Sequence, residues 1–177
     1  MIIRRITEED FLDFWLVFKR VIMEGFPEYP LSVRQFFVGK DFVNTYLKKE
    51  IKDWDFMVWL AKEAREILGF LVVEELYGGV SYADWIGVLP EYQGRGVGSG
   101  LIHFWEEKVL EEKGHKLLLL APSNGRKQFY LKLGFKEEGL EEKSWYGVNH
   151  WLFGKLIASP ESKVILKGLD LQNYRKR

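Results

Sequence analysis

The stretch that decides the fold lies in the middle of the chain and reads Val88-Leu-Pro-Glu-Tyr-Gln-Gly-Arg-Gly-Val-Gly-Ser-Gly100. An apolar strand pattern ends here, glycines alternate with other residues, and an amphipathic helix pattern begins at once. Glycine lets the backbone turn its N–H groups toward a ligand because no Cβ stands in the way. The N-terminus of the following helix adds aligned donors and a partial positive charge, which favour phosphate groups. The stretch therefore predicts a phosphate cradle.

Two common phosphate-binding loops do not match this spacing. The P-loop requires a lysine directly after its last glycine, and no lysine follows any of these glycines. The dinucleotide fingerprint Gly-x-Gly-x-x-Gly ends on Ser99 when it is counted from Gly94, and on Leu101 when it is counted from Gly96. What is present, in residues 93–98, is the order Gln-x-x-Gly-x-Gly. A nucleotide-binding module is therefore disfavoured.

The composition narrows the class of protein. A chain of 177 residues is long enough for one domain with a real core, and its 16% aromatic content predicts an aromatic-rich core and cleft. Basic and acidic residues number 26 each, so no net charge attracts nucleic acid or a membrane. The lack of cysteine excludes disulfides and zinc–thiolate sites. With no signal-peptide pattern and no run of ~20 apolar residues, we expect a cytoplasmic protein.

Periodicity and turn signals predict an α/β chain. The expected strands span residues 1–6, 55–63, 66–77, 80–89, 116–122, 135–138 and 145–156, with a further short strand at 164–166. The first expected helix follows Thr7, which has capping-box spacing to Asp10. Three further helices are expected at residues 32–49, 96–113 and 123–133. The buried face of the first helix is predicted to hold Phe11, Leu12, Trp15, Phe18 and Ile22. We expect one domain over residues 1–158, with 159–177 as its extension or a tail.

The glycine stretch, with Val88 and Pro90 before it, resembles the acetyl-CoA-binding motif of the GNAT superfamily of N-acetyltransferases. A second segment, Tyr130-Leu-Lys-Leu-Gly-Phe135, is similar to the superfamily's Tyr-x-Lys-Leu-Gly-Phe segment. The order of expected elements agrees with that fold as far as about Leu156. The resemblance implies a mixed central sheet of about seven strands, flanked by about four helices and splayed between strands four and five.

The resemblance also implies that acetyl-CoA is the acetyl donor and that no metal takes part. The pantetheine arm would lie in the splay and pair with backbone groups of Ile86, Gly87 and Val88. A glycine inside a strand is typical of a bulge or a close backbone approach, although simple packing also accounts for it. The pyrophosphate would be wrapped by the backbone N–H groups of Gln93, Gly94, Arg95, Gly96, Val97, Gly98 and Ser99.

Three side chains near the cofactor keep alternative roles. Gln93 either donates to a phosphate or braces the loop, and Arg95 either contacts a phosphate or points to solvent. The superfamily often carries an asparagine seven residues before its tyrosine, whereas this chain has Ser123 with Asn124 beside it. Which of these two contacts the cofactor stays open. Arg126 and the lysine after it are candidates for the 3′-phosphate, with a solvated helix face as the alternative.

The reaction that the resemblance implies is direct attack of an amine on the acetyl thioester. Tyr130 occupies the superfamily's tyrosine position, where its phenol would protonate the departing thiolate, and the alternative is a core aromatic. The amine arrives protonated, so a base or a water chain must take its proton. Asp84 is the first candidate base and Glu75 the second, because both lie on strands expected to line the cleft.

The acceptor should be selected by the loop at 25–32, the second helix and residues 143–150. Aromatic side chains there favour a small-molecule primary amine, and a peptide amine, at a protein N-terminus or a lysine, is the alternative. The rival from another class is a non-catalytic domain that binds or senses acyl-CoA. The three histidines are too scattered for a metal site, although His150 is a candidate for the acceptor site. We expect no nucleic-acid or membrane partner, and exposed aromatic strands are compatible with a homodimer.

Overall fold

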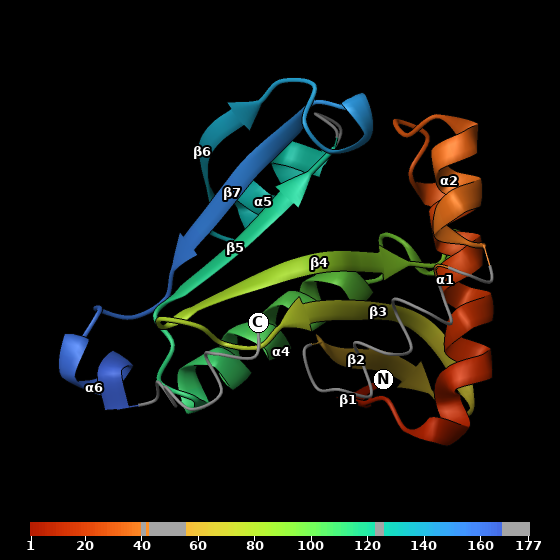
Figure 1. Ribbon diagram of the computed structural model, residues 1–177. Helices are drawn as coiled ribbons and strands as arrows, with labels where there is room; N and C mark the ends of the chain where they lie inside the picture. Colours follow the sequence, from red (N-terminus) through yellow and green to blue (C-terminus); the bar gives the residue numbers. More distant parts are fainter. Residues whose placement is uncertain (40–41, 43–55, 123–125, 168–177) are drawn as a thin grey trace.

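The computed structural model describes residues 1–39, 42, 56–122 and 126–167, and its centre is one mixed sheet in the order β1-β2-β3-β4-β5-β7-β6 (Figure 1). The seven strands are β1 Ile2–Arg5, β2 Phe56–Glu63, β3 Glu66–Glu74, β4 Val80–Val88, β5 Lys116–Ala121, β6 Lys136–Glu141 and β7 His150–Leu156. All neighbours pair antiparallel except β4 and β5, which are parallel. The predicted fold class is confirmed.

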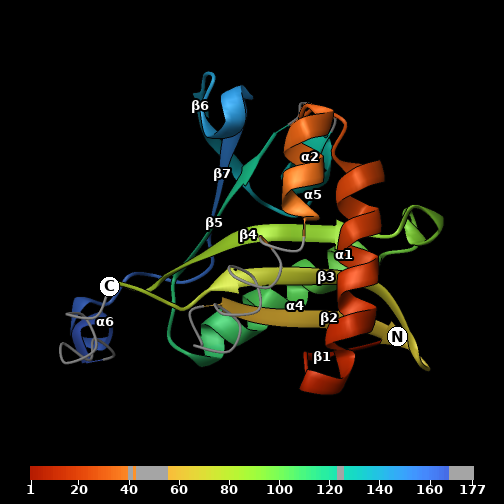
Figure 2. The same ribbon diagram turned by 45° about the vertical axis from the view of Figure 1, so that its right-hand side comes forward.

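Helices cover both faces of the sheet. They are α1 Phe11–Gly25, α2 Leu31–Phe37, α4 Val97–Glu111, α5 Lys127–Lys132 and α6 Ser162–Lys167. In Figure 2, α1 and α2 lie on one side of β2–β4, and α4 lies on the other. A sheet whose central strand is buried along nearly its whole length, as β3 is, requires cover on both faces. Among the described residues, no helix has the length and apolar character needed to cross a membrane.

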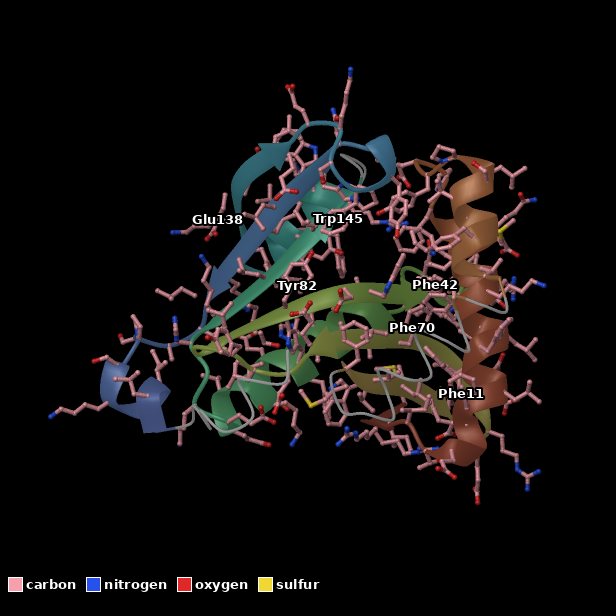
Figure 3. The ribbon with its side chains drawn as sticks, viewed as in Figure 1. Phe11, Phe42, Phe70, Tyr82, Glu138 and Trp145 are labelled. Atoms are coloured by element: carbon pink, nitrogen blue, oxygen red, sulfur yellow. The ribbon has the colours of Figure 1, made fainter. Side chains whose placement is uncertain are left out.

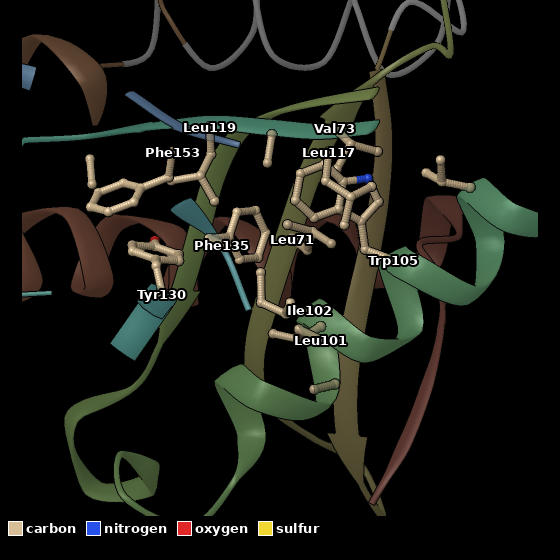
Figure 4. Packing of buried hydrophobic residues seen from close by; sticks show 14 of the residues in the cluster. Leu71, Val73, Leu101, Ile102, Trp105, Leu117, Leu119, Tyr130, Phe135 and Phe153 are labelled. Carbon is tan, nitrogen blue, oxygen red and sulfur yellow. The ribbon is translucent and has the colours of Figure 1, made fainter. Parts of the chain in front are cut away.

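Each face has its own aromatic core. Under α4, Trp105 is fully enclosed and its indole N–H donates to Ser81 Oγ at 2.8 Å, within the cluster drawn in Figure 4. Under α1, the rings of Phe14 and Phe18 lie 5.4 and 5.5 Å from that of Phe70. The indole is polar only at its N–H, which is why this buried group needs the serine as a partner.

The start of α1 is fixed by a buried ionic network. Asp10 accepts hydrogen bonds from both Nη atoms of Arg4, at 2.7 and 2.8 Å, and from Lys62 Nζ at 2.7 Å. It also accepts from the backbone N–H of Thr7 at 2.9 Å, the reach-back expected of a capping box. These donors hold the pKa of the Asp10 carboxyl far below its usual range, with Arg4 contributing most.

Three local predictions are wrong. Leu12 is exposed, because the buried stripe of α1 runs through Phe14, and Leu12 lies about 200° around the helix from that residue. Residues 145–147 form a single 3-10 turn and not a strand, since Tyr146 has a φ of 58°, which cannot continue extended backbone. Residues 164–166 belong to the helix α6. Most of the expected extension of the second helix toward residue 49 lies outside the described residues.

The sheet opens between β4 and β5. The two strands pair only from Val80↔Lys116 to Ala83↔Leu119. Beyond Ala83, β5 continues to pair with β7 on its other edge, while β4 follows β3, and Figure 1 shows the two strands diverging. Among the residues that the structure describes, the inner edge of β4 thereby has no strand partner along its last residues, which matches the splay expected from the sequence.

Candidate active site

A cavity of about 790 Å³ lies where β4 has left β5. This volume is within the range of small-molecule and cofactor pockets. Three segments far apart in the sequence line it, and their residues include Gly25, Phe26, Pro27, Glu28, Ile86, Gly87, Val88, Gln93, Gly94, Gly96, Val97, Gly98, Ser99, Arg126, Phe129 and Tyr130. Most of the residues predicted to bind the cofactor are thus brought together around one space.

The glycine loop has the backbone that a phosphate cradle needs. Gly94 and Gly96 have φ values of 74° and 83°, in the left-handed region, and a Cβ at either would meet no atom within 4 Å. Packing therefore leaves room for a side chain, and the backbone conformation is what requires glycine. Helical bonding begins with Gly100 N–H to the Gly96 carbonyl at 2.8 Å, so the N–H groups of residues 97–99 precede it and border the cavity. The residues present fit a pyrophosphate.

The structure separates the alternative roles left by the sequence. Gln93 Nε2 donates to the Val88 carbonyl at 3.1 Å, so it braces the loop against the end of β4. Arg95 is exposed and its guanidinium lies 5.3 Å from the centre of the Tyr92 ring. A Cβ on Gly87 would lie 2.5 Å from Val21 of α1, so close packing accounts for this glycine. The two polar residues at 123 and 124, Ser123 and Asn124, lie outside the described residues.

Arg126 spans the cavity from the start of α5 to the loop that follows α1. Its guanidinium donates to the Gly25 carbonyl and lies 4.4 Å from the centre of the Phe26 ring. Lys127 is ion-paired with Glu137 and lies 4.9 Å from the Trp151 ring. Both cations considered for the 3′-phosphate therefore have partners within the protein, and Arg126 forms part of the wall.

Tyr130 is both a core aromatic and a cavity residue. Its side chain is 3% exposed, and its ring lies 5.1 to 5.8 Å from those of Phe129, Phe135 and Phe153 (Figure 4). Burial raises the pKa of its phenol to about 12. The hydroxyl therefore stays protonated at neutral pH and is available as a donor at the cavity wall.

Asp84 lies at the point where the sheet opens. Val73 pairs with Ala83 and Val72 pairs with Trp85, so Asp84 is an extra residue that forms a β-bulge. Bulges next to a site re-aim side chains, and here one carboxylate oxygen is buried with no hydrogen-bond partner among the residues described. Burial, with a smaller contribution from the charge of Glu74, raises the pKa of Asp84 to about 7. A carboxyl with a pKa near neutrality is suited to act as a general base.

The two glutamates at the end of β3 have different surroundings. The charge of Glu74 acts on Asp84 and also on Tyr82, which projects from β4 and is labelled in Figure 3. The charge of Glu75 acts instead on Glu112 near the end of α4. The residue that accompanies the first candidate base is thus Glu74, and Glu75 faces other groups.

A buried hydrogen bond ties the loop after α1 to β7. Tyr29 Oη lies 2.8 Å from His150 Nε2, and His150 Nδ1 lies 2.9 Å from the Val148 carbonyl. Because Nδ1 faces a carbonyl, it carries the proton, so Nε2 accepts from the tyrosine hydroxyl. Burial raises the pKa of Tyr29 to about 12 and lowers that of His150. His150 thus holds the loop that follows α1 against the start of β7.

The comparisons with known proteins agree with this geometry. Residues 54–137 match the family model of the acetyltransferase (GNAT) domain. None of the curated proteins matches the chain in sequence. Residues 54–137 therefore form a GNAT acetyltransferase domain by this model, which confirms the resemblance found in the sequence.

Solved structures of this class share the fold at low sequence identity. One is the PaiA N-acetyltransferase from Thermoplasma acidophilum in complex with coenzyme A, with a TM-score of 0.72, 16% identity and coverage of 88% of this chain and 98% of that one. A ribosomal-protein-alanine N-acetyltransferase from Brucella melitensis has a TM-score of 0.69, 18% identity and coverage of 88% and 99%. A spermidine N-acetyltransferase SpeG chimera from Vibrio cholerae and hSSAT has a TM-score of 0.68, 17% identity and coverage of 94% and 99%.

Proposed function

We propose that the protein transfers the acetyl group of acetyl-CoA to a small-molecule primary amine by direct attack within a ternary complex. Acetyl-CoA, when bound, supplies an activated acyl thioester. The observation that carries the proposal is a single cavity that joins the glycine cradle, the unpaired edge of β4 and Tyr130, with Asp84 just beyond it on the same strand. Holding both reactants in one cavity replaces a bimolecular encounter by a positioned one, which is a large part of the catalysis.

The backbone provides the binding groups. The N–H groups of residues 97–99 hold the pyrophosphate at the start of α4. The edge of β4 at Ile86 and Gly87 offers peptide groups to the pantetheine arm, as an added strand would use them. A peptide N–H of the same edge, aimed at the thioester oxygen, stabilises the negative charge that develops there.

Asp84 takes the proton of the amine. With a pKa of about 7, its carboxyl is roughly half ionised at neutral pH, so it accepts a proton and passes it on to water. The neutral nitrogen then forms the C–N bond with its lone pair as the C–S bond breaks, and the electrons of that bond leave on the sulfur. The nitrogen, positively charged after it attacks, loses its second proton to water and becomes the amide N–H.

The leaving group needs only partial help from Tyr130. A thiol has a pKa of ~8.5, so full proton transfer from a phenol of pKa about 12 to the thiolate is uphill by ~3.5 units, or ~5 kcal/mol. Tyr130 therefore donates a hydrogen bond to the departing sulfur, and the thiolate is protonated finally by solvent. This role differs from the complete proton transfer expected from the sequence.

The enclosure of the acceptor side supports a small molecule. Phe26 and Tyr29 are 6% and 7% exposed, and Arg126 and His150 hold their loop against α5 and β7. Among the similar structures, one is named for spermidine and another for a ribosomal protein, so the fold accommodates both kinds of acceptor. An acceptor side walled by buried rings favours the smaller kind.

The test is the release of free thiol from acetyl-CoA with a panel of small amines, amino acids and peptides. The melting temperature is measured alongside, with and without acetyl-CoA. Release with small amines supports the proposal, and release only with peptides identifies a protein acetyltransferase. A raised melting temperature with no release across the panel identifies a non-catalytic acyl-CoA-binding domain.

A further inference from the structure

One wall of the cavity carries a carboxylate with one oxygen that is buried and accepts no hydrogen bond from the described residues. Glu28, in the loop between α1 and α2, lines the cavity, and its Oε2 atom is buried with no hydrogen-bond partner in the described part of the chain. A buried carboxylate oxygen without a donor is costly and is normally satisfied by a hydrogen bond or a cation. Arg126 reaches the same loop, but its guanidinium donates to Gly25 and lies on Phe26.

A second carboxylate oxygen that is buried with no hydrogen-bond partner among the described residues, Oδ2 of Asp84, lies on a neighbouring segment. Asp84 is followed directly by Trp85, whose ring centre lies 5.7 Å from that of Phe26. Phe26 is two residues from Glu28, so the loop and the bulge of β4 are neighbours in space. The rings between them offer an apolar surface, and both ends of this region carry an unpartnered oxygen.

We propose that Glu28 binds a second, protonated nitrogen of the acceptor, and that the acceptor is therefore a diamine or a longer polyamine. This inference rests on the proposed function. The reacting nitrogen must be neutral to attack, whereas a second amine with a pKa near ~10 keeps its charge. A carboxylate and an ammonium form a strong, charge-assisted hydrogen bond in a shielded position, while the methylene chain packs on the aromatic rings.

Two further carboxylates act on the side of the region where Asp84 lies. The carboxylates of Glu74 and Glu141 act on Tyr82, whose hydroxyl lies on the same side of β4 as Asp84. They add a negative potential at the mouth of the opening, which attracts a polycation. The described cation at the loop, Arg126, is held by its own contacts, so Glu28 is available to a ligand.

The test compares 1,4-diaminobutane and spermidine with butylamine, an amine with the same chain length as the first and only one charge. We expect kcat/KM for the diamine to exceed that for butylamine by about 10–100-fold, because only the diamine gains the second charged contact. Glu28→Gln should lower kcat/KM for the diamine by about the same factor, mainly through KM, and should lower kcat/KM for butylamine far less. Glu24→Gln is the matched control, since Glu24 lines the same cavity but is exposed and paired with Arg20 at 3.2 Å.

Several results would overturn the inference. Equal kcat/KM for the diamine and butylamine would show that no second charged contact is made. An equal decrease of kcat/KM for both amines in Glu28→Gln would show the same. A weaker acetyl-CoA affinity in Glu28→Gln, measured by calorimetry, assigns the carboxylate to the cofactor instead. Thiol release with butylamine but not with diamines refutes this inference alone, whereas release only with peptides, or no release with any amine, refutes the proposed function with it.

Discussion

Replacing Asp84 by asparagine should both inactivate the protein and make it more stable at neutral pH. The ordinary pKa of this carboxyl is 3.8, and in the folded protein it is about 7, mainly because of burial. Because the pKa of Asp84 is raised by folding, this carboxyl makes its full contribution to the free energy of unfolding below pH 3.8. That contribution is lost as the pH rises through 7. Asparagine has the same shape and no such titration.

The size of the effect follows from the two pKa values. Between pH 5 and pH 7 the unfolded chain holds this carboxyl ionised, while the folded chain holds it largely protonated. Each pH unit in that interval lowers the free energy of unfolding by up to ~1.4 kcal/mol. Because the folded protein is itself partly ionised near pH 7, the total decrease between pH 5 and pH 7 is about 2 kcal/mol. For a chain of this length, the melting temperature of Asp84→Asn relative to that of the unchanged protein should be higher at pH 7 than at pH 5 by about 4–8 °C.

The assay is urea unfolding of both proteins at pH 5 and at pH 7, with kcat/KM measured across the same range. Comparing the two pH values cancels the cost of placing an amide in the site, since that cost does not depend on pH. We expect kcat/KM of the unchanged protein to increase with pH, with its midpoint at about pH 7. In Asp84→Asn, kcat/KM should be lower by about 100-fold or more.

A second variant tests the cause of the shifted pKa. Glu74→Gln removes the negative charge that adds to the effect of burial, so the rise in kcat/KM should move to lower pH with little change in its plateau. Parallel stability curves for Asp84→Asn and the unchanged protein between pH 5 and pH 7 would falsify the buried, titrating carboxyl. Full activity in Asp84→Asn would show that water, and not this residue, removes the proton.

Three further predictions concern the cradle, the leaving group and the network under α1. Gly96→Val and Gly78→Val both place a side chain at a positive φ with open space around it, so each should lose at least about 1–2 kcal/mol of stability, but only the first should abolish the heat of acetyl-CoA binding. Tyr130→Phe should lower kcat about 10–100-fold while acetyl-CoA affinity stays the same. An unchanged kcat would show that Tyr130 only packs in the core and takes no part in the reaction. Asp10→Asn should cost about 3–5 kcal/mol at neutral pH, because it leaves the buried amine of Lys62 without its charge partner. The pKa of Asp10 is lowered by folding, so the unchanged protein should lose its advantage over this variant as the pH falls below 3.8, and a constant difference in urea midpoints would contradict the network.

The cofactor side of the site was predictable from the sequence because it is local. The cradle depends on glycines at adjacent positions, on their positive φ values and on the start of α4, all within residues 93–100. The segment that begins at Tyr130 likewise places its tyrosine on the short helix after a buried strand. The strands were found for the same reason, since alternation and turn residues are properties of neighbours along the chain.

The sequence named the segments expected on the acceptor side, but it did not predict the contacts between them, because these contacts join distant parts of the chain. The bulge at Asp84 exists only in register with β3, and the hydrogen bond from Tyr29 to His150 joins residues 121 positions apart. A single glutamate in an aromatic loop was the only sequence signal for Glu28, and its burial depends on how α1 meets the end of β4. The exposed Leu12 shows the same limit, since one periodic pattern fits more than one face.

The sequence by itself thus determined the α/β architecture, the resemblance to the GNAT domain and the glycine loop before α4, all of which depend on backbone conformation and short-range spacing. Only the tertiary structure decided which carboxylates are buried without partners, which glutamate acts on Asp84 and which contacts close the acceptor side. The physical reason is that burial and electrostatic coupling are set by whatever the fold brings within a few ångströms, and the order of residues along the chain does not contain that distance.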